Sequence, residues 1–238
     1  MNKGVLLGLV ILLAAAIGFG GWYAYTGSQI GAAPEATPAA GTATSAATGT
    51  DTAGSTAATD VPLPEIAADE MTLGNADAPV TIVEYFSLGC IHCKHFHEEI
   101  LPQLKADYID TGKVRLVFRD FPLDGVALAA AQLSRCVSPM AYFAMVDTIF
   151  KQQEAWHIQE GVPVLAGIAK GAGMDQAAFD ACIANKELRD KIIAGTQQGS
   201  NTFKVEATPT FIINGKKLSG VGDYAPFKEA VEAALAAQ

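Results

Sequence analysis

The sequence predicts an α/β domain in which a β-α-β unit and a terminal β-β-α unit enclose an all-helical insertion. Apolar runs rich in branched and aromatic residues predict strands at residues 79–86, 114–119 and 207–213. Between the second and third runs, from about residue 124 to 204, apolar residues recur at helical spacing, with breaks that indicate about five helices. Asn214-Gly215 then separates two β runs, which is a strong hairpin signal because both turn residues need positive φ.

The first 26 residues differ from this domain. Lys3 is their only charged side chain, and the uncharged run from Gly4 to Tyr25 is long enough to cross a bilayer. Trp22 and Tyr23 lie at its outer end, where aromatic rings favour the membrane interface. The position of the positive charge predicts a signal anchor, a transmembrane helix with its N-terminus in the cytoplasm. A cleaved signal peptide is the alternative, and both interpretations export the rest of the chain.

Composition divides the remainder into a tether and a domain. Residues 27–64 are mostly Ala, Thr, Gly, Ser and Pro, which cannot offset chain entropy by burial, so we expect a disordered tether. Residues 65–238 are long enough for one globular domain with a substantial core. The net charge of -9 argues against binding to nucleic acid, which requires clustered Lys and Arg.

Within the domain, breakers and caps place the other elements in order. A helix is expected from residue 91 to about 109, bent at Pro102 and ended by Gly112. The strand that follows it completes a β-α-β unit, which predicts a right-handed parallel crossover. The last helix is expected from about Asp223, a suitable N-cap, to Ala236.

The stretch Cys90-Ile91-His92-Cys93 carries the chemistry. It lies between a predicted strand and the first helix, so Cys90 is placed at a helix N-terminus. Unpaired N–H groups and the helix dipole favour a thiolate there. Cys93 lies one turn further on and can close a disulfide with Cys90. We expect Cys90 to be the nucleophile, favoured as a thiolate by backbone N–H groups and by His92, and Cys93 to be its buried partner.

Cys-x-x-Cys at the first helix, together with Thr208-Pro209 at the hairpin strand, resembles the DsbA-like branch of the thioredoxin superfamily. The resemblance covers roughly residues 71–238, and the matching stretches are residues 74–80, 84–87, 90–93 and 207–211. It implies a thioredoxin fold and a protein-disulfide oxidoreductase, most simply a dithiol oxidase that introduces disulfides into periplasmic proteins. The redox-active disulfide Cys90–Cys93 would serve without any other cofactor.

The resemblance also implies roles for residues outside the cysteine motif. Thr208-Pro209 corresponds to the cis-proline loop that faces the disulfide, although residue type alone allows an ordinary trans proline at a strand start. Glu84 corresponds to the acidic residue beneath the cysteines, with a role in proton transfer or in tuning Cys93. Alternation alone would also allow Glu84 an edge or solvent-facing strand position. Ile91 replaces the proline of the best-known members, which leaves the redox poise open.

The other two cysteines, Cys136 and Cys182, lie in the helical insertion. Four cysteines allow three pairings. If Cys90 pairs with Cys93, an oxidising compartment would pair the remaining two. Such a structural disulfide resembles that of some members of the branch, and two separate buried thiols are the alternative.

The expected partners follow from the same resemblance. They are reduced exported polypeptides as substrates and a DsbB-like membrane reoxidase, acting on a monomer held at the periplasmic side of the inner membrane. A disulfide isomerase or reductase on the same fold is the nearest alternative function. A metal-binding protein is the alternative from another class, since a Cys/His cluster is present at Cys90, His92, Cys93, His95 and His97.

Overall fold

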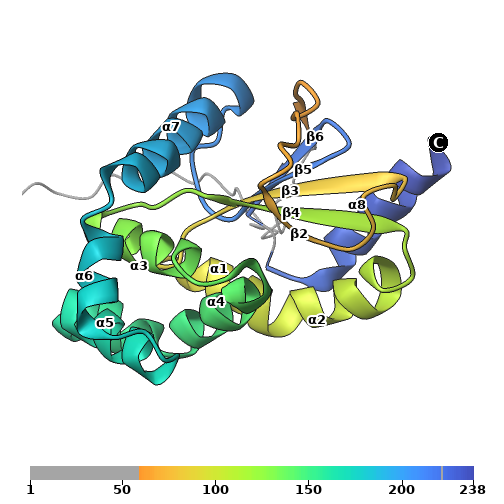
Figure 1. The fold of residues 1–238 in the computed structure, drawn as a ribbon. Coiled ribbons are helices and arrows are strands. Elements are labelled where there is room, and N and C mark those ends of the chain that lie inside the picture. Colours follow the sequence, from red (N-terminus) through yellow and green to blue (C-terminus); the bar gives the residue numbers. More distant parts are fainter. Residues whose placement is uncertain (1–58, 221) are drawn as a thin grey trace, which may run out of the picture. The chain divides into compact units, whose positions relative to one another are not determined.

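A single mixed sheet organises the part of the chain that the computed structural model describes, residues 59–220 and 222–238. The strand order is β1-β6-β5-β3-β4-β2 (Figure 1). The strands are β1 (Thr59–Asp60), β2 (Met71–Leu73), β3 (Val80–Phe86), β4 (Val114–Asp120), β5 (Thr210–Ile213) and β6 (Lys216–Ser219). The central strand β3 pairs in parallel with β4 and antiparallel with β5, so its backbone is satisfied on both sides.

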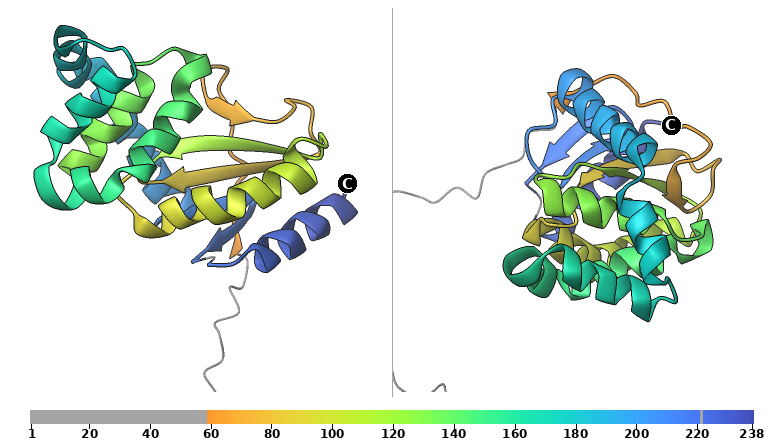
Figure 2. Two further views of the ribbon diagram at one scale, coloured as in Figure 1. Left: turned by 90° about the horizontal axis from the view of Figure 1, so that it is seen from below. Right: turned by 60° about the vertical axis from the view of Figure 1, so that its left-hand side comes forward.

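Helices cover both faces of this sheet and extend one end of it. They are α1 (Ile91–His95), α2 (Leu101–Leu104), α3 (Gly125–Arg135), α4 (Tyr142–Lys151), α5 (Val162–Gly171), α6 (Gln176–Ile183), α7 (Lys186–Phe203) and α8 (Tyr224–Ala236). A π-helical turn at Phe96–Ile100 joins α1 to α2, and a second one at Lys105–Ile109 continues α2, so that residues 91–109 form one helical stretch. This stretch and α8 lie side by side on one face, as Figure 2 shows in its left view.

Alternation along β3 divides its side chains between the two faces. Val80, Ile82 and Phe86 join the larger core beneath α1 and α8. Val83 and Tyr85 point to the opposite face, where a smaller core is closed by the C-terminal end of α7. Glu84 therefore belongs to the same face as the helix that carries the cysteines.

The predicted fold class is confirmed. A β-α-β unit, a helical insertion and a β-β-α unit follow one another, and the insertion spans α3 to α7. Asn214 and Gly215 form the hairpin turn with φ of 44° and 84°. The Asn214 side chain also ties this turn to β3, because its Oδ1 accepts from the Thr81 N–H at 2.8 Å.

Three details differ from the sequence-based expectation. Residues 59–64, assigned to the tether by composition, include β1, which pairs with β6, and Val61, whose N–H donates to the Gly215 carbonyl at 2.8 Å. The short strand β2 was not predicted either, because two or three residues are too few to show a periodicity. Asp223 is the N-cap of α8, but its side chain makes no capping hydrogen bond.

The predicted anchor at residues 1–26 lies outside the described residues, as does the tether up to residue 58. Among the residues that are described, no helix combines the length and the apolar character needed to span a bilayer.

Candidate active site

Cys90 and Cys93 lie where β3 passes into α1. Cys90 is the N-cap of α1, with an extended backbone, and Cys93 is on the first turn. Both are thiols in this structure. The turn is held by the Cys90 N–H, which donates to the Ser87 carbonyl at 3.0 Å, and by the Ser87 N–H, which donates to the Cys93 sulfur at 3.5 Å. Cys90 retains 9% exposure while Cys93 has none, so a large partner can reach only the first sulfur.

The surroundings separate the acidities of the two sulfurs. The pKa of Cys90 is lowered to about 5, chiefly because the Cys93 thiol donates a hydrogen bond to its thiolate. Thr208 and the backbone N–H groups of Cys93 and His92 act in the same direction, and burial opposes them. Burial raises the pKa of Cys93 well above its ordinary value, and the Glu84 charge adds to this effect. Cys90 is thus the thiolate and Cys93 the thiol at neutral pH.

His92 acts through its backbone rather than its ring. Its N–H is one of the groups that lower the pKa of Cys90. Its side chain is exposed, and among the hydrogen bonds of the described residues none involves the His92 imidazole. We expected His92 to favour the thiolate, and in this structure its contribution comes from its backbone N–H.

Thr208-Pro209 lies against Cys90, 118 residues away in the chain. The peptide bond between them is cis, so the trans-proline alternative is wrong for this structure. The Cys90 thiol donates to the Thr208 carbonyl at 3.2 Å. The Thr208 hydroxyl is buried and makes no hydrogen bond within the described chain, so it is an available donor when Cys90 ionises.

Glu84 is fully buried beneath the cysteines. It faces Phe118 of β4 and Phe211 of β5 in register, so the edge or solvent-facing alternative is wrong. Its Oε1 lies 3.2 Å from Nε2 of His97, and its Oε2 has no hydrogen-bond partner within the described residues. Burial raises the pKa of Glu84, and His97 counteracts part of the rise. A buried carboxyl near two sulfurs is suited to holding or passing a proton.

The histidines around the motif do not converge on one point. His95 hydrogen-bonds the Gly222 carbonyl at 2.9 Å, whereas His97 turns inward to Glu84 and packs against Phe150 with ring centroids 4.6 Å apart. Across residues 59–238, apart from those left undescribed, no group of three or more His, Cys, Asp or Glu side chains could hold a metal ion. The proposed Cys/His metal cluster therefore has no support in the geometry.

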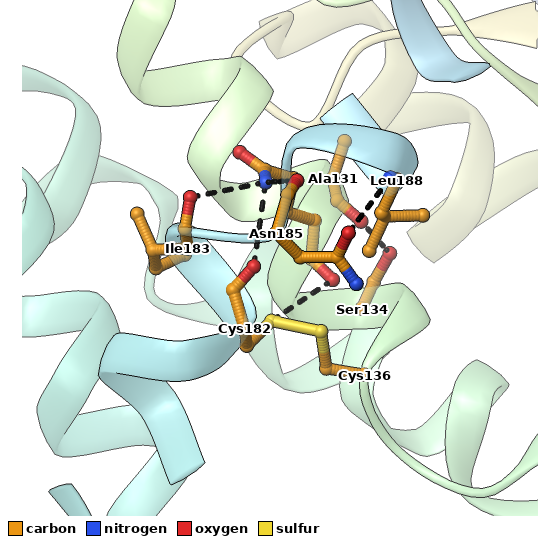
Figure 3. The surroundings of a disulfide bond; sticks show 8 residues. Ala131, Ser134, Cys136, Cys182, Ile183, Asn185 and Leu188 are labelled. Atoms are coloured by element: carbon orange, nitrogen blue, oxygen red, sulfur yellow. Dashed lines mark hydrogen bonds between the residues drawn. A yellow bond between two sulfur atoms is a disulfide. The ribbon is translucent and has the colours of Figure 1, made fainter. Parts of the chain in front are cut away.

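The second cysteine pair lies inside the helical insertion, and Figure 3 shows its surroundings. Cys136 at the end of α3 is joined to Cys182 of α6 by a disulfide, with Cα atoms 6.0 Å apart. Gln132 of α3 stabilises the same corner, because its Nε2 donates to the carbonyls of Ile183 and Asn185, each at 3.2 Å. The disulfide and the amide together fasten α3 to the α6–α7 turn.

Gln153 was not predicted from the sequence. Its buried side chain reaches the active-site turn, residues 88–90, which leads from β3 into α1. Its Nε2 donates to the Leu88 carbonyl at 2.6 Å and to the Cys90 carbonyl at 3.1 Å. A single glutamine in a polar stretch of helix gives no sequence signal that distinguishes it from a solvated surface residue.

Comparison with known proteins agrees with this geometry. A family model described as thioredoxin matches residues 67–233, which include both halves of the site. The chain belongs to the thioredoxin family. Within this family it is DsbA-like: it is 32% identical to the crystal structure of Wolbachia pipientis alpha-DsbA1, with a TM-score of 0.66, covering 74% of this chain and 94% of that one.

Two further relatives show how much of each chain is shared. Disulfide bond formation protein D of Bacillus subtilis is 28% identical over 169 residues, 68% of this chain and 76% of that protein. A curated relative from Rickettsia bellii is 34% identical over 153 residues, which are 63% of this chain. This chain covers only 59% of the Rickettsia protein's own length.

Proposed function

We propose that this protein is an exported protein-disulfide oxidoreductase that acts as a dithiol oxidase through Cys90 and Cys93. The observation that carries the proposal is the inequality of the two sulfurs: Cys90 at the rim among hydrogen-bond donors, Cys93 fully buried behind it. When the thiolate of Cys90 is favoured, the reduced form of the pair is stabilised, so its disulfide becomes a strong oxidant. Electrons then flow from client thiols to this protein.

The reaction has two exchange steps. A client thiolate attacks Cys90 of the Cys90–Cys93 disulfide, so a client–Cys90 bond forms and the bond to Cys93 breaks. Cys93 leaves with the electron pair and takes up a proton. A second client thiolate then attacks the client sulfur of the mixed disulfide, which forms the client disulfide and releases Cys90 as a thiolate. The client dithiol loses two electrons, and the cysteine pair gains them.

The neighbouring residues have distinct tasks in this scheme. The Thr208-Pro209 loop faces Cys90 and would present the Thr208 backbone to an extended client segment, in the manner of an added strand. Pro209 lacks an N–H and so offers no donor of its own to the sulfur. Glu84 lies where it could supply or accept the proton of Cys93, with His97 holding one of its oxygens.

The proposed location is the periplasmic side of the inner membrane. Residues 1–26 have the sequence of a signal anchor or a cleaved signal, and either would export the domain. The Cys136–Cys182 disulfide also suits an oxidising compartment. There, a membrane quinone reductase of the DsbB kind would accept the two electrons and re-form the Cys90–Cys93 disulfide. The protein would act as a monomer.

The reduction potential of the Cys90–Cys93 pair, from a glutathione titration, tests the direction of electron flow. We expect a value nearer the roughly −120 mV of DsbA than the roughly −270 mV of thioredoxin. A value in the thioredoxin range would replace the oxidase by a reductase.

Two activity assays separate the oxidase from the isomerase. The distinction matters because a crystal structure that is 27% identical to this chain, with a TM-score of 0.64, is that of a protein-disulfide isomerase from Novosphingobium aromaticivorans. We expect rapid oxidation of a reduced dithiol peptide and little rearrangement of a scrambled disulfide substrate. Cys90→Ser should abolish oxidation, while the double variant Cys136→Ala/Cys182→Ala serves as a control that keeps it. Equal oxidation by Cys90→Ser would refute the catalytic assignment.

A further inference from the structure

Gln153 belongs to the helical insertion, and its side chain hydrogen-bonds the active-site turn on both sides of Gly89. Among the residues that the structure describes, no other side chain of the insertion does so. Its Nε2 uses its two hydrogens on the carbonyls of Leu88 and Cys90, at 2.6 and 3.1 Å. Gln153 is 5% exposed, so these bonds form out of reach of bulk water. The Cys90 carbonyl also accepts from the Lys94 N–H at 3.1 Å, which is the first hydrogen bond of the α1 turn.

The backbone that carries Gln153 is itself fixed. Gln153 lies between α4 and the π-helical segment Glu154–Glu160. Trp156 in that segment has no exposure, and its indole N–H donates to the Ile149 carbonyl at 2.8 Å. A fully buried tryptophan with a satisfied N–H is a rigid anchor. The amide of Gln153 is therefore held at a defined distance from the turn.

A second residue of the insertion, His157, contacts the same turn at Gly89. A Cβ placed on Gly89 would lie 2.7 Å from Nε2 of His157, so the imidazole lies directly against this backbone. The His157 ring is held by Asp124, the N-cap of α3, at 2.8 Å. The insertion thus contacts all three residues of the turn, 88–90, and two of those contacts come from Gln153.

We propose that Gln153 is a positioning residue: by holding the carbonyls of Leu88 and Cys90, it keeps the N–H groups at the start of α1 directed at the Cys90 sulfur. The inference rests on the proposed redox role of Cys90 and adds the residue through which the insertion controls it.

The physical reason lies in what the thiolate requires. The N–H groups of His92 and Cys93 stabilise the thiolate only while Cys90 keeps its N-cap conformation, with φ −87° and ψ 123°. Without the amide, two buried carbonyl oxygens next to the sulfur lose a donor. The turn would then relax to satisfy them, and any movement that swings the amides away or brings a carbonyl nearer disfavours negative charge on sulfur.

The chain contains a matched control for this role. Gln132 is also buried, at 3% exposure, and its Nε2 also donates only to backbone carbonyls, those of Cys182, Ile183 and Asn185. Gln132 lies beside the Cys136–Cys182 disulfide and contacts the α6–α7 turn, not the active-site turn. Replacing either glutamine by methionine keeps the side-chain volume nearly constant and removes the donor. Loss of stability is thus common to both variants, whereas an effect on Cys90 belongs to Gln153 alone.

The test measures the pKa of Cys90 by thiolate absorbance at 240 nm in Gln153→Met, Gln132→Met and the unchanged protein. We expect Gln153→Met to raise the pKa by about one unit and to weaken the Cys90–Cys93 disulfide as an oxidant about tenfold, which is about 30 mV. Gln132→Met should lower thermal stability without moving either value. If Gln153→Met does not fold, Gln153→Ala against Gln132→Ala gives the same comparison with smaller side chains.

The outcomes separate this inference from the proposed function. A Cys90 pKa that is low in the unchanged protein and equally low in Gln153→Met overturns the positioning role and leaves the oxidase intact. Equal shifts in the Gln153 and Gln132 variants also overturn it, because a general loosening would then explain both. A pKa near that of free cysteine in the unchanged protein would instead defeat the oxidase proposal itself.

Discussion

The two cysteine pairs of this chain lie at opposite ends of helices. Cys90 is the N-cap of α1, where the helix dipole and free N–H groups favour an anion. Cys136 is the C-cap of α3, where the dipole disfavours one. The first pair is separated by two residues and has unequal burial, and the second closes 46 residues of chain as a disulfide. The helix dipole thus favours a thiolate at Cys90, which suits thiol–disulfide exchange, and disfavours one at Cys136, which suits a stable disulfide.

The largest effect expected from this contrast is on stability. The double variant Cys136→Ala/Cys182→Ala removes a 46-residue closure, which in the chain-entropy model is worth about 4 kcal/mol of unfolding free energy. For a domain of this size the melting temperature should fall by about 10 °C. Calorimetry of the oxidised proteins measures it.

The same variant should leave the active-site chemistry unchanged, since neither cysteine contacts the Cys90 turn. The rate of dithiol oxidation at 25 °C is the control measurement. An unaltered melting temperature would show that this disulfide does not stabilise the fold. A loss of dithiol oxidation would show that the two cysteine pairs are not independent.

The local features of the site could be predicted from the sequence, and the contacts between distant segments could not. The motif and its helix N-terminus were predictable because Cys90 and Cys93 are local in sequence and follow a recognisable strand. Contacts between distant segments were not: the pairing of Glu84 with His97 and the amide of Gln153 depend on how the insertion packs. A strand as short as β1 has too few residues to show a period, so composition assigned it to the tether.

The pH dependence of the reduction potential tests the unequal acidities directly. Below pH 5 both sulfurs take up protons on reduction, two protons for two electrons, so the potential should fall by about 59 mV per pH unit. Above pH 5, Cys90 stays a thiolate and only Cys93 takes up a proton, so the slope should halve to about 30 mV. The measurement is a glutathione titration repeated between pH 4 and 8.

The stability of the reduced protein must follow the same linkage. The pKa of Cys90 is about 5 in the folded state, below that of an unfolded cysteine, so the thiolate stabilises the fold fully above the unfolded pKa. This contribution declines as pH falls and is absent below about pH 5. The reduced protein should therefore gain stability relative to the oxidised protein as pH rises from about 5 to about 8; above the pKa of an unfolded cysteine the raised pKa of Cys93 acts in the opposite direction. A single potential slope of 59 mV across the range would contradict both expectations.

The smallest effect is expected from the buried carboxyl beneath the reactive pair. Glu84→Gln keeps the shape and the contact with His97 but can no longer exchange a proton with Cys93. We expect the attack of Cys93 on the mixed disulfide between a client and Cys90, which is the reverse of the first exchange step, to slow by roughly tenfold. This is below the usual range for general acid–base catalysis, because losing the Glu84 charge also lowers the pKa of Cys93 and offsets part of the loss.

Asp120→Asn is the matched control for Glu84→Gln. Asp120 is a second buried carboxyl at the same end of the sheet, opposite Phe86 in register, and its charge is paired with Arg135 at 2.7 Å rather than with the cysteines. Both variants should lose stability, since each alters a buried carboxyl group that is hydrogen-bonded to a neighbouring side chain. Only Glu84→Gln should slow the stopped-flow decay of the mixed disulfide and, because the expulsion of Cys93 is the reverse of that step, also the attack of a client thiolate on the Cys90–Cys93 disulfide. Equal decay rates in the two variants would mean that the proton of Cys93 reaches solvent by another route.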